Sequence, residues 1–260
     1  MTAVPTTHHL STSRGEVELS TLENGSGRPV LLLHGGAGPQ SVAVFADLLA
    51  ESRGVRVITP THPGFGGTPR PDGIADIPAL AEVYVTLLDE LGLDDVTVIG
   101  NSVGGWIASE IALRHSPRVS RMVLVDATGP VVDGYPGIDF FSIPIPQIAD
   151  YSFFAPDNFR IDPSTLSPAA QAGFAANRAT LAVYGGPTMD DPTLLGRLGE
   201  IDVPTLVIWG EADRIVEPGY GRAYAAAIPG ARFELLSGTG HVPQVETPEL
   251  LLAAVAVVMS

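Results

Sequence analysis

The chain has 260 residues, a formal net charge of −15, 45% hydrophobic residues and a mean hydropathy of +0.25. This length and hydropathy suit one globular α/β domain, while the acidic balance excludes nucleic acid and anionic membranes as favoured partners, since those need clustered cations. All 14 basic residues are arginine, and cysteine is absent. The composition therefore excludes lysine Schiff bases, phosphate-binding lysines, disulfides and thiolate catalysis.

The N-terminal stretch MTAVPTTHHLSTSRGE lacks the basic start and apolar core of a signal peptide. We expect residues 1–12 to form a loose polar tail. The longest apolar run, Leu250–Met259, is too short to span a bilayer. These features predict a cytoplasmic protein with no membrane partner.

Apolar periodicity predicts the first regular elements. Glu16–Leu22 alternates apolar and polar residues, as an edge strand does, whereas Pro29–Leu33 is continuously apolar, as in a strand buried on both faces of a parallel sheet. The next predicted elements are a helix at Val42–Ser52, a strand at Val55–Ile58 and a helix at Asp76–Leu91.

A loop of small residues, His34–Pro39 (HGGAGP), directly follows the apolar run. Small residues let the backbone approach a bound oxygen closely, so the amide of Gly36 or Ala37 is a candidate donor to an oxyanion. We interpret His34 as a structural residue that orients this loop, and His62, in the glycine-rich loop HPGFGGT, as structural or pocket-lining.

The stretch Asp95–His115 carries the strongest functional signal. A β-branched strand at Val96–Ile99 enters the turn GNSVGG, and an amphipathic helix is predicted from Trp106 to His115. Ser102, at the tip of that turn, is expected to adopt a strained backbone conformation, with glycines on either side relieving the contact of strand and helix. Unpaired amides at the start of the helix would face a developing negative charge. This arrangement predicts a nucleophile for acyl transfer.

A buried strand at Met122–Val125 ends at Asp126, and regular alternation of strands and helices then stops until about Glu200. The intervening segment is rich in proline and holds nine of the 17 aromatic residues. Because so long a loop is unusual inside a compact domain, we predict a small, mainly helical cap at 129–200, inserted into a core formed by 1–128 and 201–260. Some cap aromatic residues are expected to line a substrate pocket, with four candidates: Phe140, Phe141, Phe153 and Phe154.

Regular structure returns after the predicted cap. The expected elements are strands at Pro204–Trp209 and Arg232–Leu236, and helices at Pro218–Ala227 and Thr247–Met259. Ser102, Asp213 and His241 all follow predicted parallel strands, whose carboxyl ends meet at one edge of the sheet. The chain order of serine, acid and histidine is that of the α/β hydrolases.

With these residues in place, the sequence resembles the α/β-hydrolase superfamily over nearly the whole chain outside the predicted cap. The motifs that carry the resemblance are HGGAGP (34–39), HPGFGGT (62–68), GNSVGG (100–105), WGEADRIVEP (209–218) and GTGHVPQVETPE (238–249). The resemblance implies a mostly parallel twisted sheet flanked by helices, with the cap inserted after the strand ending at Asp126.

It also implies site roles: Ser102 as nucleophile, His241 as general base and then acid, and Asp213 as the group that orients the imidazole. The amide of Val103, together with that of Gly36 or Ala37, would form the oxyanion hole. Asp126 is a rival for the acid.

The motifs leave the reaction open. The leading hypothesis is hydrolysis of a small or medium, largely apolar ester or lactone, because the cap is aromatic and holds few arginines. The elbow GNSVGG also resembles that of carbon–carbon bond hydrolases acting on diketones from ring fission, although those usually carry tryptophan where Val242 stands. Arg178 is a possible counterpart of their cap arginine, or an ordinary exposed residue.

The remaining resemblances narrow the choice further. Proline iminopeptidases share HGGAGP but normally have tryptophan in place of Val103, and dehalogenases and epoxide hydrolases use aspartate in place of Ser102. A cofactor-free oxygenase or a ligand receptor on the same fold stays a third hypothesis. The sequence implies a small-molecule substrate and no cofactor or metal, and it leaves the oligomeric state open.

Overall fold

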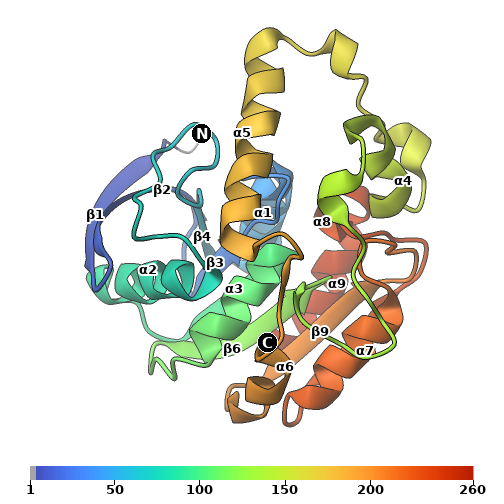
Figure 1. Cartoon of the computed structure of the whole chain (residues 1–260). Helices are drawn as coiled ribbons and strands as arrows, with labels where there is room; N and C mark the ends of the chain where they lie inside the picture. The colour runs from blue at the N-terminus through green and yellow to red at the C-terminus, as the bar shows by residue number, and fades with distance from the viewer. Residues whose placement is uncertain (1–3, 260) are drawn as a thin grey trace.

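A computed structural model describes residues 4–259 and places eight strands in one sheet, in the order β1-β2-β4-β3-β5-β6-β9-β10 (Figure 1). The pairs β1/β2 and β2/β4 are antiparallel, and every other neighbouring pair is parallel. The bounds of these strands are β1 Thr6–Thr12, β2 Gly15–Gly25, β3 Pro29–Leu33, β4 Arg56–Pro60, β5 Val96–Asn101, β6 Val119–Val125, β9 Thr205–Gly210 and β10 Arg232–Leu236.

Helices cover both faces of the sheet. One core cluster joins the sheet to α2, α3 and α7, and a second joins its other face to α1 and α9. The bounds are α1 Gln40–Arg53, α2 Ile77–Glu90, α3 Val103–Ala112, α7 Pro218–Ala227, α8 Pro243–Glu246 and α9 Pro248–Met259. Within residues 4–259, no helix has the length and apolar character needed to cross a membrane.

The central strands are buried because their sequences are apolar on both faces. Every residue of β5 and β9 is buried, as expected for parallel strands covered by helices on both sides. Among the flanking helices, α2 begins where the Asp76 side chain accepts a hydrogen bond from the Ala79 amide at 2.7 Å. The predicted mostly parallel sheet flanked by helices is therefore confirmed.

The N-terminal prediction is wrong at two points. Thr6–Thr12 forms strand β1 instead of a loose tail, because each of its residues pairs with one of β2. Consequently β2 lies between β1 and β4, and the edge strand is β1 rather than the predicted Glu16–Leu22. Residues 1–3 of the predicted tail lie outside the described part of the chain.

The segment between β6 and β9, called here the β6–β9 segment, stands over one end of the sheet (Figure 1). Its short strands β7 and β8 pair in parallel, and its other elements are helical. Their bounds are β7 Gly129–Pro130, β8 Asp190–Asp191, α4 Ile148–Ser152, α5 Pro168–Gly185 and α6 Leu194–Arg197, with single 3-10 turns at Phe140–Ser142, Ile145–Gln147, Pro156–Asn158, Pro163–Thr165 and Leu198–Glu200.

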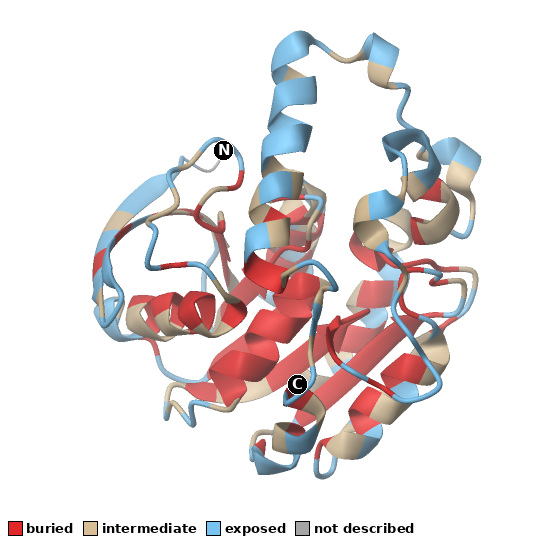
Figure 2. Ribbon diagram, in the orientation of Figure 1, coloured by how far each residue is buried: buried red, intermediate tan, exposed pale blue. Residues whose placement is uncertain are grey.

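Helix α5 is attached to the core by its C-terminal half. Tyr184 donates a hydrogen bond to the carbonyl of Pro63 at 2.7 Å, and Thr180 donates to that of Gly64 at 3.1 Å. Leu181, between them, is buried, whereas the N-terminal half of α5 is largely exposed (Figure 2). The loop at 62–68 therefore supports one wall of the space between the β6–β9 segment and the sheet.

Candidate active site

Ser102 occupies the sharp turn between β5 and α3, with φ 56° and ψ −123°. This backbone conformation is costly for any residue with a Cβ atom and is typical of functional turns. Helix α3 begins at Val103, three residues earlier than predicted, so Ser102 immediately precedes it. The glycines are required: a Cβ on Gly100 would lie 2.1 Å from the Gly104 carbonyl oxygen, and one on Gly104 would lie 2.4 Å from that of Leu33.

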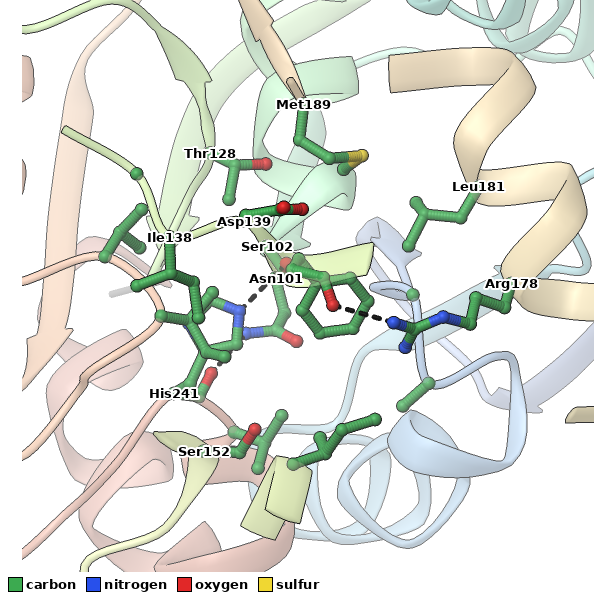
Figure 3. A pocket seen from close by; sticks show the side chains of 18 of the residues that line it. Asn101, Ser102, Thr128, Ile138, Asp139, Ser152, Arg178, Leu181, Met189 and His241 are labelled. Carbon is green, nitrogen blue, oxygen red and sulfur yellow. Dashed lines mark hydrogen bonds between the residues drawn. The ribbon is translucent and has the colours of Figure 1, made fainter. Parts of the chain in front are cut away.

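Ser102, His241 and Asp213 form one hydrogen-bonded chain. The Ser102 Oγ lies 2.9 Å from His241 Nε2 (Figure 3). On the other side of the ring, His241 Nδ1 lies 2.8 Å from Asp213 Oδ2. The other carboxylate oxygen of Asp213 accepts from the amides of Ile215 at 2.8 Å and Val216 at 3.1 Å. Asp213 and His241 are 2% and 6% exposed, so water competes little for these bonds. Such a chain can activate a hydroxyl for nucleophilic attack.

Asn101 is a residue whose contribution the sequence reasoning missed. Its buried side-chain amide donates to the carbonyl of His241 at 3.0 Å and to that of Val125 at 3.2 Å. Its Oδ1 accepts from Gln244 Nε2 at 3.0 Å. Asn101 therefore ties the serine turn to the loop that carries His241. The signal available in the sequence was an amide residue directly before Ser102, in the motif GNSVGG.

The predicted oxyanion donors lie near Ser102 but differ in exposure to the cavity. Gly36 and Ala37 line the same cavity as Ser102. Val103 is not among the lining residues, because its side chain is buried in the core, while its amide begins α3 beside Ser102. A Cβ on Gly36 would lie 2.7 Å from the Leu181 Cδ2, so a larger residue there would require the Leu181 side chain to shift.

Behind this loop, His34 and His62 are fully buried, with ring centroids 3.7 Å apart. His34 Nε2 accepts from the His62 amide at 3.2 Å, and His62 Nε2 is 2.9 Å from the His34 carbonyl. His34 Nδ1 lies 2.8 Å from the carbonyl of Gly35, and His62 Nδ1 contacts the Tyr84 hydroxyl.

Every ring nitrogen of this pair therefore has a partner that suits a neutral ring. Burial lowers the pKa of His62 to about 4 and that of His34 well below its usual range. Neither residue is among those lining the cavity. Their positions agree with the structural interpretation of His34 and with the structural alternative for His62.

Asp126 lies beside the hydrogen-bonded chain and is fully buried. It accepts from the Gly210 amide at 2.7 Å. Burial, together with the nearby Asp213 charge, raises the pKa of the Asp126 carboxyl well above its usual range. Within residues 4–259, one group of at least three histidine, aspartate or glutamate side chains has its potential metal-ligand atoms within 4.8 Å of one another. It consists of Asp126, Asp213 and His241. His241 is hydrogen-bonded to Ser102 and Asp213, and Asp213 also accepts from two backbone amides. We therefore interpret this group as part of the serine–histidine–aspartate chain and not as a metal site.

A cavity of about 700 Å³ lies between the serine turn and the β6–β9 segment, and its lining is mostly apolar. Ser102 and His241 lie at one side of it, facing Leu181 and Arg178 of α5 (Figure 3). This volume lies within the usual range for small-molecule sites. Of the six residues considered as substrate contacts, four line it: Phe140, Phe153, Arg178 and Val242.

The structure places the other two candidates, Phe141 and Phe154, outside this lining. Phe141 packs against the core cluster and lies 5.5 Å from the Arg178 guanidinium. Phe154, which follows the C-cap of α4, is 58% exposed. Sequence composition marks the whole segment as aromatic, but it does not say which side of the backbone each ring occupies.

Arg178 lines the cavity without a carboxylate partner among the described residues. Its Nη2 donates to the carbonyls of Phe140 at 2.7 Å and Ile143 at 3.2 Å, and its guanidinium lies 4.9 Å over the Phe140 ring. The alternative of an ordinary exposed helix arginine therefore does not describe it. The guanidinium retains N–H donors, at Nε and Nη1, for which no protein partner is found in the described chain.

Thr128 is a further lining residue that the sequence reasoning missed. Its amide donates to the Ser102 carbonyl at 3.2 Å, while its buried hydroxyl has no hydrogen-bond partner among the described residues. A buried hydroxyl without a partner is uncommon, so a polar atom of a bound molecule would suit it. Thr128 lies shortly after β6 in the sequence, and no motif there indicates that it lines the cavity.

A mostly parallel sheet, with a serine at a strand-to-helix turn and an aspartate and a histidine after later strands, defines the α/β-hydrolase class. A model of the alpha/beta hydrolase family matches residues 30–254, and the chain belongs to that family.

Two relatives and one solved structure illustrate the range of similar proteins. The 2-hydroxymuconate semialdehyde hydrolase of Pseudomonas putida is 30% identical over 247 residues, covering 87% of this chain and 85% of its own. Lipase 1 of Psychrobacter immobilis is 29% identical over 242 residues, covering 86% and 75%. A thermophilic esterase from Thermogutta terrifontis superposes with a TM-score of 0.74 at 25% identity, covering 99% and 98%.

Proposed function

We propose that this hydrolase acts through an acyl-enzyme on Ser102 and cleaves a small or medium, largely apolar carboxyl ester or lactone. One observation carries the proposal. The Ser102 hydroxyl is hydrogen-bonded to His241, which is hydrogen-bonded to buried Asp213, at the side of an apolar cavity.

The chemistry follows from the positions of these groups. His241 Nε2 accepts the hydroxyl proton as Ser102 Oγ attacks the substrate carbonyl, and it then delivers that proton to the departing alcohol oxygen. Asp213 holds the imidazole in orientation and stabilises its charged form. The amide of Val103, with that of Gly36 or Ala37, would donate to the oxyanion, each donor lowering the barrier by about 3 kcal/mol. Water activated by His241 then releases the acid.

The same proposal assigns residues 129–200 as a cap on a core formed by 1–128 and 201–260. Its support is topological: β6 and β9 are neighbours in the sheet, and the elements between them contribute most of the apolar lining opposite Ser102. An apolar lining favours uncharged acyl or alcohol groups, since desolvating them costs little.

The test is hydrolysis of p-nitrophenyl acetate, butyrate and octanoate, with intact-mass analysis after a fluorophosphonate probe. We expect wild-type protein to turn over at least one ester and gain one probe mass, and Ser102→Ala to lose both. The chain-length profile would size the acyl side of the cavity. Tight binding of a ligand with neither turnover nor labelling would refute the acyl-enzyme proposal and favour a receptor or a cofactor-free oxygenase.

A carbon–carbon bond hydrolase of ring-fission diketones is the second candidate, and Arg178 favours it. Arg178 lines the cavity and has N–H donors without a protein partner among the described residues, so an anionic substrate group could receive charge-assisted hydrogen bonds from it. The 30% identical relative named as a 2-hydroxymuconate semialdehyde hydrolase points the same way. Loss of the coloured dienol form of such a diketone, with Ser102 labelled but no ester turned over, would select this reaction.

A further inference from the structure

Glu246 lies in the predicted motif GTGHVPQVETPE, and the proposed reaction gives it no role. It ends the short helix α8, shortly after His241. Its carboxylate accepts hydrogen bonds from three backbone amides. Oε2 accepts from Gly240 at 2.7 Å and from Phe154 at 3.1 Å, and Oε1 accepts from Ala155 at 3.0 Å. Hydrogen bonds to a charged carboxylate are stronger than those between neutral groups. The three amides therefore hold the Glu246 carboxylate in one defined position.

The three donors come from two separate parts of the chain. Gly240 directly precedes His241, whereas Phe154 and Ala155 form the turn after α4 in the β6–β9 segment. The same two parts are also joined by backbone, because the His241 amide donates to the Ser152 carbonyl at 2.8 Å. Close approach is built in at this point: a Cβ on Gly240 would lie only 2.3 Å from that carbonyl oxygen.

A parallel contact reaches the loop of the proposed acid. The Arg214 amide, next to Asp213, donates to the Tyr151 carbonyl at 3.1 Å, and Arg214 Nη1 donates to the carbonyl of Asp150 at 3.0 Å. The end of α4 therefore touches the loops of both His241 and Asp213. The loop that carries His241, residues 237–242 between β10 and α8, is called here the histidine loop. The Glu246 side chain accepts hydrogen bonds from backbone amides both of this loop and of the turn after α4.

We propose that Glu246 is a positioning residue that joins the turn after α4 to the histidine loop. The position of His241 relative to Ser102 then depends on the packing of the β6–β9 segment against the core. This inference rests on the proposed function. Its physical basis is that the Gly240, Phe154 and Ala155 amides share one carboxylate, so loss of that group releases both sides together. The contacts that remain between this region and the core would be the backbone bond from His241 to Ser152 and those from Arg214 to Tyr151 and Asp150.

The test compares Glu246→Ala and Glu246→Gln with the wild type, and uses Glu51→Ala as the matched control. Glu51 is an exposed glutamate on α1, so its removal makes the same change in net charge. Glutamine keeps the volume of Glu246 but retains only one acceptor oxygen, so it serves if the alanine variant folds poorly. The readouts are the rate constant for fluorophosphonate labelling of Ser102 and backbone hydrogen exchange, both well below each variant's melting temperature.

We expect labelling of Glu246→Ala to slow by about 10- to 100-fold, as for a small misplacement of a catalytic group, with Glu246→Gln intermediate and Glu51→Ala unchanged. Exchange should accelerate together in peptides covering Phe154–Ala155 and Gly240–His241, and nowhere in the central strands. A purely structural role would change the melting temperature without this paired local pattern.

Labelling within about twofold of wild type, or faster exchange on one side only, would overturn the positioning role. A wild type that is neither labelled nor active would instead refute the proposed function. In that case the exchange measurement still tests whether Glu246 joins the two segments, so the two failures are distinguishable.

Discussion

The buried His34–His62 pair predicts a specific loss of stability in acid. Burial lowers the pKa of His62 from 6.5 to about 4. Between these values the unfolded chain binds a proton that the folded chain does not, so stability falls as the pH falls through this window. At about 1.4 kcal/mol per pH unit, His62 alone removes ~3 kcal/mol of unfolding free energy between about pH 7 and pH 4.

Other groups titrate in the same range, so the wild-type profile alone does not isolate His62. The pKa of His34 is lowered by burial and by His62, and it acts in the same direction. The pKa of Asp126 is raised by burial, which stabilises the folded state at low pH and acts oppositely. A difference between wild type and His62→Gln cancels the Asp126 contribution, and it counts the part of the His34 shift that comes from His62 together with His62 itself.

The measurement is urea unfolding of wild type, His62→Gln and the exposed-site control His9→Gln from pH 7.5 to pH 4, followed by tryptophan fluorescence. We expect His62→Gln to be less stable at pH 7.5, because hydrogen bonds and packing are lost. Its deficit should shrink by about 3 kcal/mol at pH 4, whereas that of His9→Gln should stay constant. A His62→Gln deficit that does not change with pH would refute the assignment of a buried neutral histidine.

Three further predictions concern the serine turn and its neighbours. Asn101→Ala should slow Ser102 labelling by about 10- to 100-fold, because the histidine loop loses the hydrogen bond from the Asn101 side chain to the His241 carbonyl; an unchanged rate would contradict this. Gly104→Ala should lower the melting temperature far more than Gly137→Ala, since a Cβ meets the Leu33 carbonyl at 2.4 Å in the first and nothing within 4 Å in the second; equal melting curves would contradict it. Asp126→Asn should keep turnover within a few-fold, while Asp213→Asn should cost about 10⁴-fold; similar losses would contradict the choice of acid.

Local patterns of apolar residues were sufficient to predict those helices and strands that bury apolar side chains against the core. The helix Pro218–Ala227 and the strand Arg232–Leu236 have the predicted bounds, because their apolar spacing or run is complete within the segment. Strand β1 was missed for the opposite reason. Its residues TTHHLST are mostly polar and exposed, and only pairing with β2 makes them a strand.

Those site residues that come directly after strands could be predicted from the sequence. Parallel strands place their carboxyl ends at one edge, so Ser102, Asp213 and His241 were expected to meet, and the structure brings them within hydrogen-bonding distance. The contacts of Asn101 with His241, 140 positions apart, and of Glu246 with Phe154 carry no periodic signal. Only the folded arrangement identifies them.

The structure also explains why the sequence offered two candidates, Asp126 and Asp213, for the acid that orients the histidine. Asp126 follows β6 and Asp213 follows β9, and these strands are neighbours, so each carboxyl has an oxygen within 4.8 Å of a ring nitrogen of His241. Their surroundings differ. Asp213 accepts from His241 and from two amides, an arrangement that stabilises a negative charge. Asp126 accepts from one amide, and burial beside Asp213 raises the pKa of its carboxyl. Because Asp213 is the carboxylate that is hydrogen-bonded to the imidazole, the acid in the proposed mechanism is Asp213, while Asp126 supports the start of the neighbouring loop through Gly210.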